Sequence, residues 1–191
     1  MRKIHVAILM MAGAACALAG CGKRTQALEY GYYRIDLPKA AYHTYAEGLP
    51  YTFELSDYAK VTPLDDEPYW MNIDYPAWNA TIHCSYKSLK NCALRDVAED
   101  TRTLVYRHAI RADAIAEDYF ENDAHRTYGV LYEIEGNAAS SVQFFVTDSV
   151  RHFVRGSLYF NNLPNADSIA PVNAFIRSDI RHMMETLTWK K

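Results

Sequence analysis

Residues 127–160 read TYGVLYEIEGNAASSVQFFVTDSVRHFVRGSLYF and contain three runs of alternating apolar and polar residues, at 127–135, 141–147 and 152–160. Alternation with a period of two is typical of half-buried β-strands. The links Gly136–Ser140 and Asp148–Arg151 are short and rich in residues that suit tight turns. These residues therefore predict a three-stranded antiparallel meander.

Side chains along a strand point to opposite faces in turn, so each face of the meander can be predicted. We expect one face to form the core, and it carries Val130, Tyr132, Ile134, Val142, Phe144, Val146, Val154, Leu158 and Phe160. The opposite face includes Leu131 and Gln143 and mixes aromatic with charged groups. Its candidate partner-binding residues are Glu133, Phe145, Phe153, Arg155 and Tyr159.

The rest of the chain predicts further strands and two helices. Aromatic and β-branched runs bounded by turn residues predict strands at 32–37, 51–55, 69–75 and 80–86. Apolar residues recur every three or four positions over 94–115 and again over 168–187, which predicts two long amphipathic helices. We therefore expect an α+β fold with a predominantly antiparallel sheet, four strands, a helix, three strands and a helix in that order.

The amino terminus has the pattern of a lipoprotein export signal. Arg2 and Lys3 precede an uncharged apolar run over residues 6–18, and Leu18-Ala19-Gly20-Cys21 follows. We expect residues 1–20 to be removed and Cys21 to carry a diacylglycerol and an N-acyl chain, which anchor the protein to a membrane. Residues 21–29 are then a lipidated tether, and residues 30–191 a single α+β domain.

Charge and cysteine content narrow the partners and the chemistry. Loss of Arg2 and Lys3 leaves 18 of the 20 basic side chains against 23 acidic ones, a balance that disfavours nucleic acid as a partner. Cys84 and Cys92 are the remaining cysteines of the domain, and an oxidising compartment permits a disulfide between them. Because Cys84 is expected on a strand and Cys92 at a helix start, the geometry for pairing is not guaranteed, and both states stay open.

No arrangement of residues points to catalysis or metal binding. The histidines after the signal are never spaced as HxxxH or HxH, and the chain has no CxxC. We therefore expect no enzyme activity, no catalytic residues, no metal and no cofactor other than the lipid on Cys21.

Several stretches, taken in order, resemble the gliding-motility lipoprotein GldD family of the Bacteroidetes. They are Glu67–Trp70, Ile73–Pro76, Glu99–Leu104, Tyr128–Tyr132, Gly136–Phe145, Arg155–Phe160 and Asp167–Pro171. The resemblance implies a non-enzymatic envelope component required for gliding, with partners among motility or type IX secretion proteins. The expected element order also looks like the PsbP-type extrinsic-protein fold, by analogy.

Two functions from different classes follow. The preferred one is an envelope lipoprotein that docks or assembles with a protein partner. The alternative is a periplasmic domain that binds or modifies a small ligand such as an envelope glycan, because its 15 tyrosines and three tryptophans suit stacking. Gly22, Lys23 and Arg24 follow the lipid without an acidic residue, so we expect a periplasm-facing domain, with the outer membrane favoured over the inner.

Overall fold

The predicted meander is present in a computed structural model of the chain, which describes residues 35–65, 67–107, 112–161 and 166–190. Its strands are β7 (Thr127–Gly136), β8 (Ser140–Thr147) and β9 (His152–Phe160), close to the expected bounds. The other strands are β1 (Tyr42–Tyr45), β2 (Tyr51–Ser56), β3 (Lys60–Pro63), β4 (Met71–Tyr75), β5 (Ala80–Ser88), β6 (Ala112–Asn122) and β10 (Thr188–Trp189). The helices are α2 (Leu94–Arg107) and α3 (Ala166–Thr186), with short 3-10 turns η1 (Pro76–Trp78) and η2 (Leu89–Asn91).

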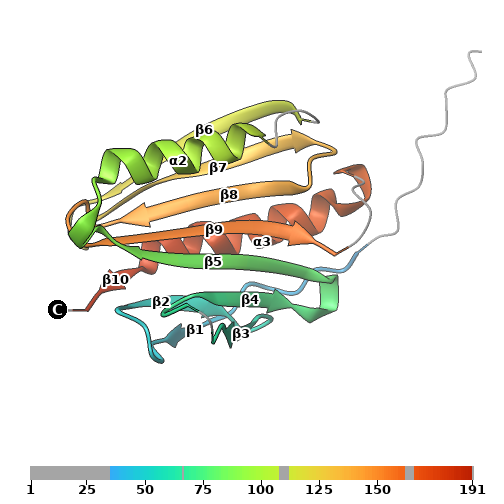
Figure 1. Ribbon diagram of the computed structural model, residues 1–191. Helices are drawn as coiled ribbons and strands as arrows, with labels where there is room; N and C mark the ends of the chain where they lie inside the picture. Colours follow the sequence, from blue (N-terminus) through green and yellow to red (C-terminus); the bar gives the residue numbers. More distant parts are fainter. Residues whose placement is uncertain (1–34, 66, 108–111, 162–165, 191) are drawn as a thin grey trace, which may run out of the picture. The chain divides into compact units, whose positions relative to one another are not determined.

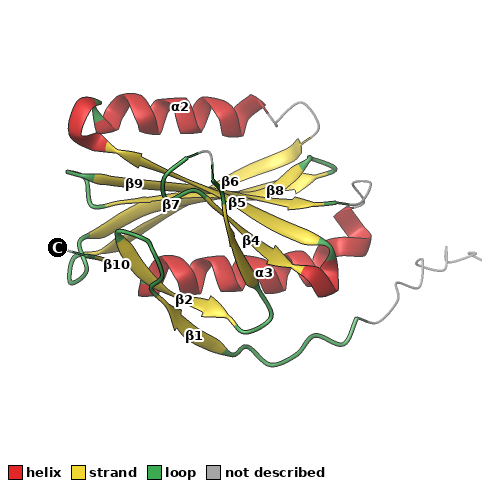
Figure 2. Ribbon diagram, turned by 60° about the horizontal axis from the view of Figure 1, so that its bottom comes forward, coloured by secondary structure: helices red, strands yellow, loops and turns green. Residues whose placement is uncertain are grey.

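The described strands form two antiparallel sheets. The larger has seven strands in the order β3-β4-β5-β9-β8-β7-β6, and the smaller has three in the order β1-β2-β10. Helix α2 lies over one face of the large sheet and α3 over the other, as Figures 1 and 2 show. The small sheet packs on the α3 side, because side chains of β2 and α3 share one core cluster with β4 and β5.

The expected single sheet flanked by two long helices is wrong. Helix α2 has 14 residues; of the part expected to continue it, residues 108–111 lie outside the described residues and residues 112–115 belong to strand β6. Ala112 and Ile115 fit the helical period by chance. β6 is rich in Ala, Asp and Glu, which strands disfavour, but nearly all of its residues pair with β7, and this pairing overrides propensity.

The element order differs from the prediction as well. In the part of the chain that the structure describes, five strands precede α2, four lie between the helices, and β10 follows α3. The PsbP-type analogy rested on the expected order and loses its basis. Of the strand expected at 32–37, residues 32–34 lie outside the described residues and 35–37 are not in a strand.

Both faces of the large sheet are buried. The side chains of β7 point to the opposite faces from those predicted. Residues paired across antiparallel strands share a face, and Leu131 pairs with Phe144 while Val130 pairs with Phe145. Leu131 therefore belongs to the α3 side, and Val130, Tyr132 and Ile134 to the α2 side. The alternating pattern could not show which face each side chain of β7 occupies, because Val130, Leu131 and Tyr132 are all buried.

Each helix buries one stripe of side chains against the sheet. Val97, Thr101 and Val105 are the buried residues of α2. Helix α3 buries a longer stripe of Val172, Ile176, Ile180, Met183 and Met184. Helix α2 covers β7, β8 and the Phe153 end of β9. The rest of that face, over β4, β5 and the remainder of β9, is left for the cleft described next.

Candidate functional site

The five residues expected to form a partner surface do not lie together. Phe145 and Phe153 are 9% and 2% exposed and stack with ring centroids 5.0 Å apart in the α2-side core. Glu133 lies on the opposite face and pairs with Arg177 of α3. Arg155 and Tyr159 are half-buried and line a cleft on the α2 side of the sheet.

The cysteines occupy different parts of the domain. Cys84 is a buried free thiol on β5 in the α3-side core, and burial raises its pKa to about 12. Cys92 is a half-buried free thiol that packs against the α2-side core and donates to the Ser88 carbonyl at 3.4 Å. Cys21, the expected lipidation site, lies outside the described residues.

The cleft has a volume of about 470 Å³ and opens over strands β4, β5 and β9. Strand pairing assembles its floor, because Asn72 lies opposite His83, His83 opposite Ser157, and Ser85 opposite Arg155. Cross-strand partners share a face, so these polar side chains converge although they are distant in sequence. The full lining is Leu64, Trp70, Asn72, His83, Cys84, Ser85, Arg155, Ser157 and Tyr159.

Arg155 is the charged group of the cleft. Its Nη2 donates to Gln143 Oε1 at 3.1 Å, while its Nε is shielded from solvent and has no hydrogen-bond partner. Burial lowers the pKa of Arg155, and neighbouring Tyr159 acts in the opposite direction without restoring it. Among the described residues no carboxylate forms an ion pair with Arg155. A half-buried cation with an N–H donor that lacks a hydrogen-bond partner destabilises the fold unless an anion binds to it.

Aromatic side chains form the rim beside Arg155. The Trp70 indole N–H donates to the Tyr86 carbonyl at 3.1 Å, which fixes a ring that is still 38% exposed. Tyr159 is half-buried and Leu64 is 38% exposed at the same cleft. Trp, Tyr and Arg are the residue types enriched where a few side chains dominate protein binding.

A second cleft of about 420 Å³ adjoins the first and shares Trp70, Ser85 and Arg155 with it. It runs toward α2, where Val97 and Leu104 form an apolar wall. Besides Arg155, its charged lining residues are Glu67, Lys87 and Asp100. The two clefts form one groove, which we call the Arg155 groove.

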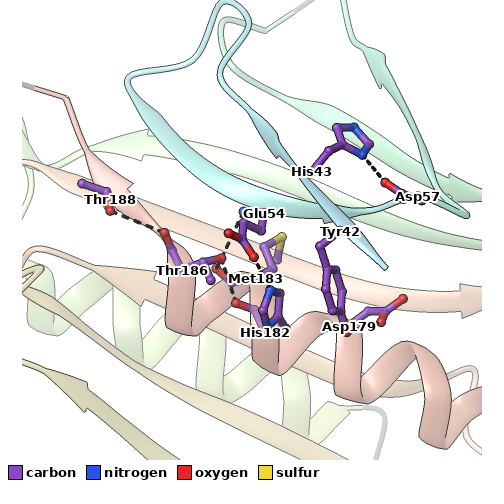
Figure 3. A network of polar contacts seen from close by, with 9 residues as sticks. All are labelled: Tyr42, His43, Glu54, Asp57, Asp179, His182, Met183, Thr186 and Thr188. Carbon is purple, nitrogen blue, oxygen red and sulfur yellow. Dashed lines mark hydrogen bonds and ion pairs between the residues drawn. The ribbon is translucent and has the colours of Figure 1, made fainter. Parts of the chain in front are cut away.

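Another polar cluster lies on the α3 side, drawn in Figure 3. Asp179, only 4% exposed, accepts hydrogen bonds from Tyr42 at 2.9 Å and Tyr75 at 3.1 Å. Burial raises the pKa of Asp179 even though these bonds act to lower it. His182 stacks on Tyr42 with ring centroids 3.8 Å apart, and its Nε2 lies 2.6 Å from Glu54 Oε2. These contacts connect α3 to β1, β2 and β4, so we interpret the role of the cluster as structural.

Sequence reasoning found Arg155 and Tyr159 but missed Trp70, Asn72, His83, Ser85 and Ser157. Part of the signal was readable, because Thr81, His83 and Ser85 alternate with the apolar Ile82 and Cys84 on β5. These residues reach Arg155 because β5 pairs with β9. Local periodicity does not predict this pairing.

The family model described as gliding motility lipoprotein GldD matches residues 23–189, which covers all but the last described residue. The chain belongs to the GldD family. Membership makes this GldD-family protein a gliding-motility-associated envelope lipoprotein, held to a membrane through lipid. A search of curated proteins found no match to it.

In the part of the GldD-family chain that the structure describes, no helix is long and apolar enough to cross a membrane.

Proposed function

We propose that the domain is a non-catalytic docking or assembly component of the envelope machinery for motility or secretion. In this proposal Cys21 carries the lipid, the domain faces the periplasm from the outer membrane, and the Arg155 groove binds a protein partner. Family membership supports the motility context. The observation that carries the docking role is the half-buried Arg155 beside the exposed, fixed ring of Trp70.

The binding of a small envelope ligand such as a glycan remains the second candidate. The observation in its favour is that the groove is concave and that Asn72, His83 and Ser157 converge in it. Pockets for small ligands combine an apolar lining with a few such polar groups.

Co-purification tests the docking proposal. Ser85→Tyr places a ring in the groove, and Val150→Tyr adds the same ring at a site that is 58% exposed and is not among the groove residues. We expect quantitative mass spectrometry of the detergent-extracted lipoprotein to find an envelope protein with the wild type and Val150→Tyr. Its recovery should fall about thirtyfold with Ser85→Tyr, because a hot-spot contact contributes about 2 kcal/mol.

Trp70→Ala is a second groove variant that adds no bulk, and circular dichroism checks that each variant is folded. Recovery that is the same for all three variants and the wild type would contradict docking through the groove.

A further inference from the structure

The floor of the Arg155 groove follows strand β9. Phe153, Arg155, Ser157 and Tyr159 alternate along it and therefore point to one face. Six steps of about 3.3 Å separate Phe153 from Tyr159, a length of about 20 Å. An extended peptide of about six residues spans the same length.

The middle of the groove is suited to a carboxylate. Arg155 lines both halves of the groove, and its Nη2 donates to Gln143, which leaves further N–H donors of the planar guanidinium for a ligand. Arginine binds carboxylates through paired, charge-assisted hydrogen bonds. A bound carboxylate would also neutralise a cation that the fold has already partly desolvated.

Each end of the groove has apolar side chains in its lining. Trp70, Leu64 and Tyr159 border the β4 end, and Val97, Leu104 and Phe153 border the α2 end. Apolar side chains on either side of the carboxylate would therefore be buried. An acidic sugar chain would place hydroxyl groups against the Val97 and Leu104 wall, where burial without hydrogen bonds is costly.

We propose that the Arg155 groove binds an extended segment of a partner protein in which an acidic residue lies between two apolar residues. The acidic side chain pairs with Arg155, on the side of Tyr159, because the α2 end has two acidic residues, Glu67 and Asp100, against the single cation Lys87. The two flanking apolar side chains fill the ends of the groove. This inference rests on the proposed docking function and names the chemistry of the partner.

Peptide binding to the full-length, detergent-solubilised lipoprotein tests the inference. The probes are acetylated and amidated hexapeptides with one glutamate between two apolar residues, each with a glutamine counterpart. We expect members of the panel to bind at least about tenfold more tightly than their glutamine counterparts, because a charged hydrogen bond is lost. Arg155→Met should abolish this preference, Arg155→Lys should retain part of it, and Arg151→Met, at an exposed residue outside the groove, should leave it intact.

Equal affinity for glutamate and glutamine peptides, or a preference that survives in Arg155→Met, would overturn the inference. Trigalacturonate is the sugar probe. Binding of trigalacturonate that requires Arg155, with no peptide bound, would also overturn it and would favour the glycan candidate. If no probe binds while Ser85→Tyr still reduces co-purification, the inferred chemistry fails but docking through the groove stands.

Discussion

At the scale of single residues, Gly156 shows how closely a side chain of one strand packs over the backbone of the next. Gly156 pairs with Phe144 across β8 and β9, and a Cβ at position 156 would overlap the Phe144 ring. Phe144 is 0% exposed, so its ring has no free space to move into. The absence of a side chain at position 156 is therefore a packing requirement of the α3-side core.

Gly156→Ala should lower the free energy of unfolding by about 1 to 3 kcal/mol, the usual cost of overpacking a core. Urea unfolding of the variant measures this change. Phe144→Leu shortens the opposing side chain, so the double variant should be less destabilised than the sum of the two single variants. Strictly additive effects would show that the alanine does not meet the Phe144 ring.

At the scale of elements, the turn between β8 and β9 is held by one carboxylate. Asp148 Oδ1 accepts hydrogen bonds from the backbone N–H groups of Val150, Arg151 and His152 at 3.0, 2.7 and 2.8 Å. Burial acts to raise the pKa of Asp148, but these three donors outweigh it and bring the pKa below its ordinary value. The turn therefore depends on an ionised side chain, and it also sets the register of the strand that carries Arg155.

Asp148→Asn should lower stability at neutral pH by about 1 to 2 kcal/mol, because the amide oxygen keeps only weaker, neutral hydrogen bonds. The folded-state pKa of Asp148 is depressed, so its ionised form stabilises the fold above the ordinary pKa of about 4 and loses this effect as the pH falls through the folded value. The difference between wild type and Asp148→Asn should therefore shrink between pH 5 and pH 3 in urea unfolding. Asp113→Asn, at an exposed position on β6, should show no such change.

Which elements the sequence predicts depends on whether their pattern is local. The α3 stripe repeats over several turns, and the prediction of 168–187 lies close to the observed Ala166–Thr186. The meander strands were likewise predicted within a residue or so. β1, β3 and β10 have two to four residues, too few to establish a period. β6 required its pairing with β7, and the groove required the register of β5 on β9, neither of which local sequence records.

At the scale of the whole molecule, the family match begins at residue 23, two positions after the cysteine proposed to carry the lipid. A diacylglyceryl group is attached to the sulfur of such a cysteine before the signal is cleaved. Cys21→Ala should therefore yield a longer precursor without acyl chains, and intact mass spectrometry measures both changes. A mature, lipidated form of the variant would rule out Cys21 as the anchor.

The side of the membrane on which the domain lies decides which partners can reach the Arg155 groove. Because Lys23 and Arg24 lie two and three residues after the proposed lipid on Cys21, trypsin has cleavage sites between the anchor and the domain wherever it gains access. If the domain faces the periplasm, trypsin added to intact cells should leave it uncut, and release should occur only after the outer membrane is permeabilised. Immunoblotting of the full-length protein measures this, and a known periplasmic protein serves as the control for membrane integrity. Release from intact cells would place the groove on the cell surface and exclude periplasmic partners, whereas protection with inner-membrane fractionation would change only the membrane that holds the anchor.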